Sequence, residues 1–252
     1  MPTNEKVLVE VCADSVASAL AAERGGGARI ELCSGLAEGG ITPSVGLMEA
    51  VRAGVSIPVR VMIRPRGGDF CYDDDEFKIM QRDIEAARMA GMDGVVLGIL
   101  DLNGDVDVTR TRQLTELARP MQVTFHRAFD MTADLFRALE DVRETGADRV
   151  LTSGGEQTAM EGQATIQRLV KQSCGRITIM AGSGIKPENA RHLIEMTGAK
   201  EIHVGLRSST ASPMQYRNPR IRLGAAEDRE YQRVAVLEEN VAKLCRAIRE
   251  RE

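Results

Sequence analysis

Short apolar runs recur along the chain, and each is followed by a longer segment whose apolar residues have helical spacing. Each run ends in a polar or glycine-rich exit, most abruptly at Arg64-Pro65-Arg66-Gly67-Gly68 after the third run. Runs of this length and composition are typical of buried β-strands. We predict eight strands, at residues 7–12, 29–33, 59–63, 94–100, 121–125, 149–152, 176–180 and 201–204.

The segments between these runs predict helices. Four of the helix-to-strand joints carry a glycine, at Gly27, Gly91, Gly146 and Gly198, where a helix end favours a left-handed residue. Eight strands with interleaved helices predict an α/β protein with one closed (β/α)8 TIM-type barrel. An open doubly wound sheet is less favoured, and no nucleotide cofactor is indicated, because no G-x-G-x-x-G follows the first strand. The predicted helices span residues 15–24, 44–53, 73–90, 109–118, 132–145, 156–172 and 186–196.

The chain changes character after its eighth predicted strand. Residues 211–226 are polar and irregular, and residues 229–251 have the pattern of a terminal helix. We therefore expect one domain over residues 1–252, with the barrel at about 6–209 and a C-terminal extension at about 210–252. That extension is expected to cover the barrel mouth, to cap the base, or to contact a partner subunit.

Composition narrows the class of protein. The 252 residues are 43% hydrophobic and 28% charged, with a net charge of −4, which suits a folded protein with a sizeable core. No basic block interleaved with aromatic residues indicates nucleic-acid binding, and no apolar run of membrane-spanning length is present. The polar N-terminus has no signal-peptide pattern, and five scattered cysteines do not suggest a disulfide framework. We expect a cytoplasmic protein with reduced thiols.

Two neighbouring predicted strands end in the same Glu-x-Cys pattern, Glu10-Val11-Cys12 and Glu31-Leu32-Cys33. Side chains alternate along a strand, so each glutamate shares a face with its cysteine. Adjacent strands lie about 4.8 Å apart, so Cys12 and Cys33 at matching heights can reach one soft metal ion, and thiolates select Cu(I) or Zn(II) over hard cations. Simple packing of buried cysteine is the alternative. The two glutamates need partners, because an unpaired buried carboxylate is costly.

Arg64 and Arg66, at the end of the third strand, are candidates for those partners, and they are equally candidates for binding a substrate. His126 ends the fifth strand, with Arg127 and Asp130 close behind, and histidine can act as acid, base or ligand near neutral pH. A hydrogen-bonded core histidine is the alternative for His126.

His203 ends the eighth strand, beside the first strand across the closure of the barrel. The glycine-rich exits of strands six, seven and eight resemble barrel loops that bind phosphate through backbone N–H groups. We assign tentative catalytic roles to Glu10, Glu31, Arg64 and His126. The residues expected to contact a substrate are Arg66, Asp69, Arg127, Asp130, Ser153, Gly182, Ser183, Gly184, His203 and Arg207.

Several of these motifs resemble those of the copper homeostasis protein CutC family. The resemblance runs from the first strand to about Asn218, and its arginine and histidine motifs are long enough to be specific. It implies a TIM-type barrel, a cytoplasmic location and a homo-oligomer, either a dimer or a tetramer. It also implies a role in copper handling, with Cu(I) bound by Cys12 and Cys33. The matching motifs are residues 10–12, 29–33, 38–44, 63–70, 123–130 and 149–154.

Two functions of different class follow from the sequence. One is a cytosolic Cu(I)-binding protein that uses the two cysteines. The other is a barrel enzyme acting on a small anionic or phosphorylated molecule, in which arginines hold the anion and Glu10, Glu31 or His126 moves protons. A copper site needs little more than two thiols, so the surplus of polar groups keeps the enzyme in consideration.

Overall fold

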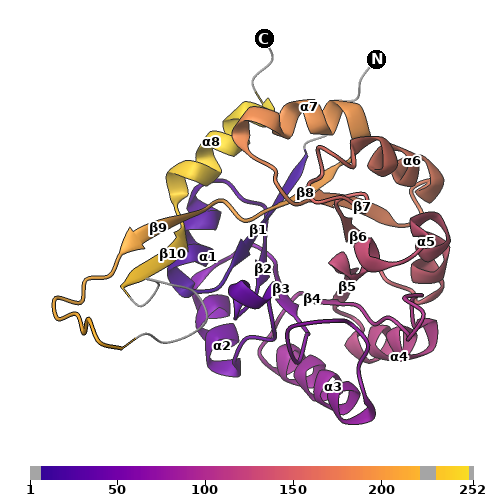
Figure 1. Ribbon diagram of the computed structural model, residues 1–252, viewed down its shortest axis with the longest axis horizontal. Helices are drawn as coiled ribbons and strands as arrows, with labels where there is room; N and C mark the ends of the chain where they lie inside the picture. The colour runs from indigo at the N-terminus through magenta and orange to yellow at the C-terminus, as the bar shows by residue number, and fades with distance from the viewer. Residues whose placement is uncertain (1–6, 222–230, 250–252) are drawn as a thin grey trace.

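The computed structural model describes residues 7–221 and 231–249, and its centre is a closed barrel of parallel strands (Figure 1). Each strand pairs with the next along the chain, and the first pairs with the eighth to close the barrel. The predicted (β/α)8 barrel is therefore confirmed. The barrel strands are β1 (Leu8–Ala13), β2 (Arg29–Leu32), β3 (Val59–Met62), β4 (Gly94–Leu97), β5 (Gln122–Phe125), β6 (Arg149–Thr152), β7 (Thr178–Gly182) and β8 (Glu201–Val204).

Helices surround the barrel on the outside, and polar caps define where several of them begin (Figure 1). Before the third helix, the Asp73 side chain accepts from the backbone N–H of Glu76, whose carboxylate accepts from the N–H of Asp73. No helix of the described residues is both long and apolar enough to span a membrane. The interleaved helices are α1 (Val16–Arg24), α2 (Val45–Gly54), α3 (Asp74–Met89), α4 (Val108–Ala118), α5 (Leu135–Glu144), α6 (Gln163–Ser173) and α7 (Pro187–Thr197).

Glycines end these helices largely as predicted. Gly91, Gly146 and Gly198 have φ angles of 72°, 79° and 71°, a left-handed region that disfavours other residues. At the first joint the prediction is wrong by one residue, because Gly26 rather than Gly27 is left-handed, with φ 92°.

The eighth place in the outer ring is taken by a helix from the end of the chain, α8 (Glu238–Arg249). It packs against α1 on one side and α7 on the other (Figure 1). A Cβ atom at Gly25 would lie 2.6 Å from the Cβ of Val241, so the two segments are in close contact. The C-terminal helix therefore completes the ring of helices around the barrel, and it does not cover the barrel's mouth.

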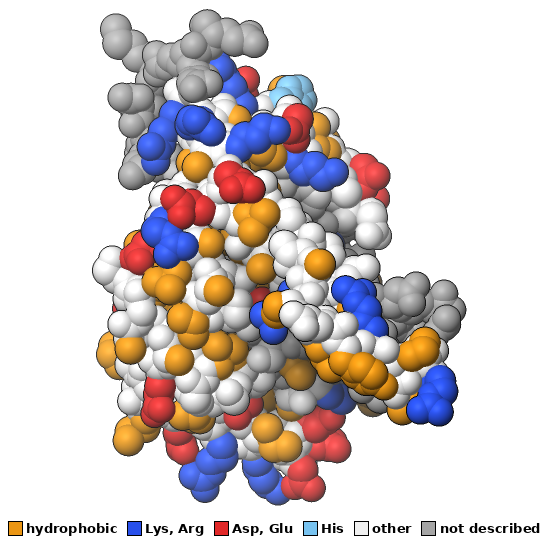
Figure 2. Space-filling view, turned by 90° about the vertical axis from the view of Figure 1, so that its left-hand side faces the viewer, with side chains coloured by type: hydrophobic (Ala, Val, Ile, Leu, Met, Phe, Trp, Pro, Cys, Tyr) orange, Lys and Arg blue, Asp and Glu red, His pale blue; other side chains and the backbone are white. Residues whose placement is uncertain are grey.

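Between β8 and α8 the chain forms a hairpin of β9 (Arg207–Ala211) and β10 (Gln232–Val236), which projects from the barrel (Figure 1). The predicted helix over 229–251 is thus wrong at 232–236, where antiparallel pairing with β9 overrides the local pattern. Its ends at 229–230 and 250–251 lie outside the described residues. Figure 2 views the molecule from this side, where charges of both signs are interspersed with apolar side chains.

Two further helix boundaries differ from prediction. Helix α6 starts seven residues later than predicted, because residues 156–162 fold back as turns. A Cβ at Gly162 would lie 1.9 Å from the carbonyl oxygen of Ser153, and only glycine allows that approach. Helix α5 starts three residues later than predicted and follows a short 3-10 helix, η2 (Arg127–Met131).

Buried charges, rather than apolar side chains alone, fill the barrel interior. Apolar residues such as Val11, Ile30 and Val61 face the helices, and they alternate with inward-facing polar residues. Three buried arginines, Arg29, Arg60 and Arg149, come from three different strands. Buried charges are tolerated only when paired, so the interior must supply a connected set of partners.

Candidate functional site

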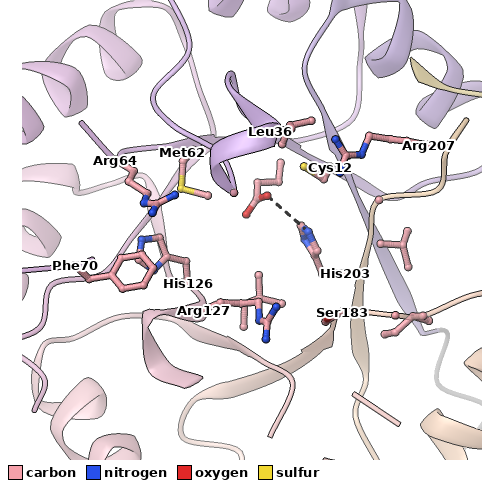
Figure 3. Close-up of a pocket in the computed structure, with 17 residues that line it drawn as sticks. Cys12, Leu36, Met62, Arg64, Phe70, His126, Arg127, Ser183, His203 and Arg207 are labelled. Atoms are coloured by element: carbon pink, nitrogen blue, oxygen red, sulfur yellow. Dashed lines mark ion pairs between the residues drawn. The ribbon is translucent and has the colours of Figure 1, made fainter. Parts of the chain in front are cut away.

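A cavity of about 300 Å³ opens at the carboxyl ends of the barrel strands (Figure 3). Active sites in barrels of this kind lie at the same end. Its polar lining combines a thiol, a carboxylate, two imidazoles and three guanidinium groups. The residues are Cys12, Glu31, Arg64, His126, Arg127, Ser183, His203 and Arg207, with apolar walls from Leu36, Met62, Phe70, Leu151, Ile185 and Val204.

The thiols of Cys12 and Cys33 lie side by side, and Cys12 lines this cavity. Their sulfur atoms are 3.9 Å apart, and both residues are buried. The arrangement follows from strand register, because Cys12 pairs with Glu31, and Cys33 lies two residues further, on the same face, just after the end of β2. Met62, from β3, and Leu36, from the 3-10 helix η1 (Leu36–Glu38), pack around the pair. The predicted proximity of the two cysteines is confirmed.

His203 connects the thiols to the two glutamates. Its Nδ1 is 3.0 Å from Glu10 Oε1, and its Nε2 is 3.6 Å from Glu31 Oε2, an ion pair that Figure 3 draws as a dashed line. Burial lowers the pKa of His203, but Glu31, Cys12 and Glu10 outweigh burial and raise that pKa well above its ordinary value. His203 is therefore a mostly buried imidazolium, with 13% of its side chain exposed, that neutralises a cluster of acidic groups.

Neighbouring groups shift the pKa values of these acidic residues in opposite directions. The hydrogen bond with Cys33 lowers the pKa of Cys12 to about 5, against the effect of burial. The same hydrogen bond and burial raise the pKa of Cys33 well above its usual range. Burial raises the pKa of Glu31 to about 8, even though His203 opposes the shift. The thiol pair thus gives up one proton readily and holds the second, as strongly interacting groups do.

Glu10 lies deeper in the barrel and is fully paired. Arg29 contacts it and also reaches Glu201 Oε2 at 2.5 Å, which Arg149 approaches at 3.2 Å. Burial would raise the pKa of Glu10, but the His203 hydrogen bond and the Arg29 charge lower it to about 2. Glu10 is therefore a permanently charged member of a buried ion-pair network.

Arg64 and Arg66 do not pair with Glu10 and Glu31, so that prediction is wrong. Instead, the Arg64 guanidinium donates to the carbonyl oxygens of Glu38, Gly40 and Gly68 at 2.7, 3.0 and 2.7 Å. Those contacts tie two loops together at the cavity wall.

Arg66 points elsewhere, to the side chains of Glu76 and Asp69. Neither Arg66 nor Asp69 is part of the cavity lining. The sequence places both arginines at the end of β3 but cannot show that their side chains diverge.

His126 lies across the cavity from Cys12, beside Arg64 and Phe70 (Figure 3). Its Nδ1 accepts from the backbone N–H of Ala128 at 3.2 Å, so the neutral ring carries its proton on Nε2. Phe70 packs against the ring with 4.9 Å between centroids. Burial and the Arg64 charge lower the pKa of His126 to about 3. The imidazole is therefore neutral and held in one orientation.

Gly98 has no side chain, and the ring of His126 occupies the space that a side chain at this position would need. A Cβ there would lie 2.7 Å from both Cε1 and Nδ1 of His126. We expect Gly98→Ala to displace the ring, to break the bond from Ala128, and to lower the free energy of unfolding by about 1–3 kcal/mol. Thermal unfolding and the ¹⁵N spectrum of His126 measure these effects.

Gly46→Ala is the matched control for Gly98→Ala. Gly46 lies in α2 with no heavy atom within 4 Å of an added Cβ. This exchange should leave His126 unchanged and keep or slightly raise stability, by up to about 1 kcal/mol. If both variants behaved alike, close packing at Gly98 would not be what holds the ring.

Comparison with known proteins places this architecture in one family. The family model of the CutC family matches residues 7–208. The chain belongs to the CutC family. It is 50% identical over 219 residues to the human protein named copper homeostasis protein cutC homolog, covering 87% of this chain and 80% of that protein. The CutC family protein of Chromobacterium violaceum is 47% identical over 243 residues, covering 96% of this chain and 97% of that protein.

A solved structure agrees with this assignment. The crystal structure of the CutC protein from Streptococcus agalactiae matches with a TM-score of 0.74 and 35% sequence identity. The match covers 78% of this chain and 97% of that one. Both the barrel and the CutC family resemblance predicted from the motifs are thus confirmed.

Within this CutC-family barrel, several predicted substrate contacts lie behind the cavity wall. Asp130 accepts hydrogen bonds from the side chain of Thr152 and from the backbone N–H groups of Ser153 and Gly155, and so braces the loop after β6. Ser153 is buried, and its hydroxyl donates to the carbonyl oxygen of Glu156. Gly182 lies next to His203, where a Cβ would come within 3.3 Å of the His203 Cβ. None of Asp130, Ser153 and Gly182 is among the lining residues.

Sequence reasoning missed Arg29, Arg149 and Glu201, which complete the network around Glu10. Each is the first residue of its strand and lies two residues before an inward-facing side chain, so it also faces the barrel interior. Extending the period-two alternation backward from Glu31 and His203 would have placed Arg29 and Glu201 inside the barrel.

Proposed function

We propose that this chain handles copper by binding Cu(I) through Cys12 and Cys33. The observation that carries the proposal is the 3.9 Å separation of the two sulfur atoms, one of which belongs to a residue that lines the cavity. Metal–sulfur bonds are about 2.3 Å long in zinc sites, so sulfurs at this spacing can share one ion. Thiolates favour soft ions such as Cu(I).

The surroundings support a soft cation more than a hard one. The low pKa of Cys12, about 5, which its hydrogen bond with Cys33 produces, supplies a thiolate at neutral pH. Met62 and Val96 pack against the pair and give it an apolar surrounding on that side. Relatives of this chain carry the name copper homeostasis protein. All five cysteines are free, which suits a reducing compartment such as the cytoplasm.

An anaerobic competition titration tests the copper site. Wild type, Cys12→Ser and Cys33→Ser are titrated with Cu(I) against a chromophoric chelator. We expect each substitution to weaken binding at least about 100-fold, since one thiolate cannot replace the pair. Cys174→Ser is the control, because this thiol is exposed at the end of α6 and should not affect binding. Unchanged stoichiometry and affinity in both buried-thiol variants would exclude the site.

A further inference from the structure

The half of the cavity away from the thiols has polar groups that the copper site does not use. His126 is buried and lines the cavity, and none of the described residues forms a hydrogen bond with its Nε2. The Nδ1 atom is already occupied by the Ala128 N–H, so Nε2 carries the hydrogen and can only donate. Buried donors normally have an acceptor, and this one has none within the described part of the chain.

Arg64 is the second unusual group. Its guanidinium is buried and satisfied by three backbone carbonyl oxygens, yet no carboxylate of the described residues forms an ion pair with it. Its Nε lacks a hydrogen-bond partner among those residues. A buried charge without a counter-charge is costly, and an anion bound in the cavity would offset that cost.

Arg207 adds a charge at the rim. It is exposed, it lines the cavity, and its guanidinium forms no hydrogen bond or ion pair with the described residues. Arg127, by contrast, is neutralised by Asp130 at 2.8 Å. Figure 3 shows Arg207 and His126 at opposite sides of the cavity. A ligand in this space would therefore meet a neutral donor on one side and an available cation on the other.

We propose that this cavity binds a small organic anion that carries a carbonyl group, with the carbonyl oxygen accepting from His126 Nε2 and the anionic group facing Arg207 on the other side. The ring is suited to this role because Phe70 and Gly98 hold it in one orientation. A neutral imidazole aimed at a carbonyl oxygen is a known way to bind and polarise that group. The anionic group is either a carboxylate or a phosphate, since both pair with guanidinium.

Four probes test this site. Acetol phosphate and 4-oxopentanoate each carry a carbonyl at a similar distance from the anionic group. Propyl phosphate and pentanoate are their counterparts with a methylene in place of the carbonyl. Each is titrated into the full chain while the side-chain ¹⁵N signals of its three histidines are followed. We expect a saturable shift at His126 Nε2 with at least one carbonyl probe, and binding about threefold to tenfold tighter than its counterpart.

Variants separate the two ends of the site. His126→Phe should abolish the preference for the carbonyl probe, and Arg207→Met should weaken both members of a pair about tenfold. Arg207 is exposed, so its replacement does not threaten folding. Arg233→Met is the control, because Arg233 lies on the same hairpin but outside the cavity lining.

Each result decides the proposal. Binding without a carbonyl preference, a shift equal for both members of a pair, or no binding by any probe would overturn it. A preference for the phosphate or the carboxylate pair would identify the anionic group. Cys12→Ser should retain the carbonyl preference, so failure of the copper site and failure of this site are separately observed.

Discussion

Replacing Arg29 by methionine is expected to lower the free energy of unfolding by about 3–5 kcal/mol, because it leaves buried carboxylates without their counter-charge. Arg29 is the group that joins Glu10 to Glu201 inside the barrel, and its other Nη2 contact is Met180 Sδ at 3.2 Å. Chemical denaturation at pH 7 measures the loss. Adding Glu10→Gln to Arg29→Met should recover part of it, since one uncompensated charge is then removed.

Arg24→Met is the matched control for Arg29→Met. Arg24 forms an ion pair with Glu238 at 2.8 Å, but both side chains are more than half exposed. An exposed pair contributes about 1 kcal/mol or less, so this variant should unfold nearly as wild type does. Equal, small losses in Arg24→Met and Arg29→Met would show that the barrel interior is hydrated enough to solvate the carboxylates.

Acid should destabilise the protein through His126. Burial and Arg64 lower the pKa of His126 to about 3 in the folded state, whereas an unfolded histidine has a pKa of about 6.5. Between these values the unfolded chain binds a proton that the native chain does not, so stability falls as pH falls. The slope from this residue is about 1.4 kcal/mol per pH unit, and it disappears above about pH 6.5.

The comparison of wild type with His126→Gln isolates this contribution from the other titrating groups. We expect the difference in free energy of unfolding between the two proteins to be constant above pH 7. It should then change in favour of the variant as pH falls toward 4, by about 1.4 kcal/mol for each unit. Parallel stability curves over the whole range would contradict a neutral, buried His126.

The features that the sequence predicts correctly are those that a few consecutive residues determine. Strand runs and helix-ending glycines such as Gly91 and Gly146 are local, and the alternation along two neighbouring strands is enough to bring Cys12 and Cys33 together. The β9–β10 hairpin was missed because β9 is mostly polar and twenty residues separate it from β10. Nothing within either strand shows that it pairs with the other.

Side-chain partners could not be predicted, because they depend on which residues the closed barrel brings to the same level. Arg64 lies where the sequence places it, but its reach to the carbonyl oxygens of Glu38 and Gly40 depends on the shape of a loop from another strand. Glu10 is the register partner of Arg29 on β2 and of His203 on β8, where the first and last strands close the barrel. Both contacts require the complete fold.

The pairing of β1 with β8 determines when during synthesis this cluster can form. Glu10 and Cys12 come from β1, while His203 comes from β8, which emerges about 190 residues later. Contacts between distant parts of a chain form late, because a long loop must close first. A growing chain that lacks β8 therefore carries both thiols but not the imidazolium of His203 beside them. The charge balance around the thiol pair is therefore established only when the barrel closes.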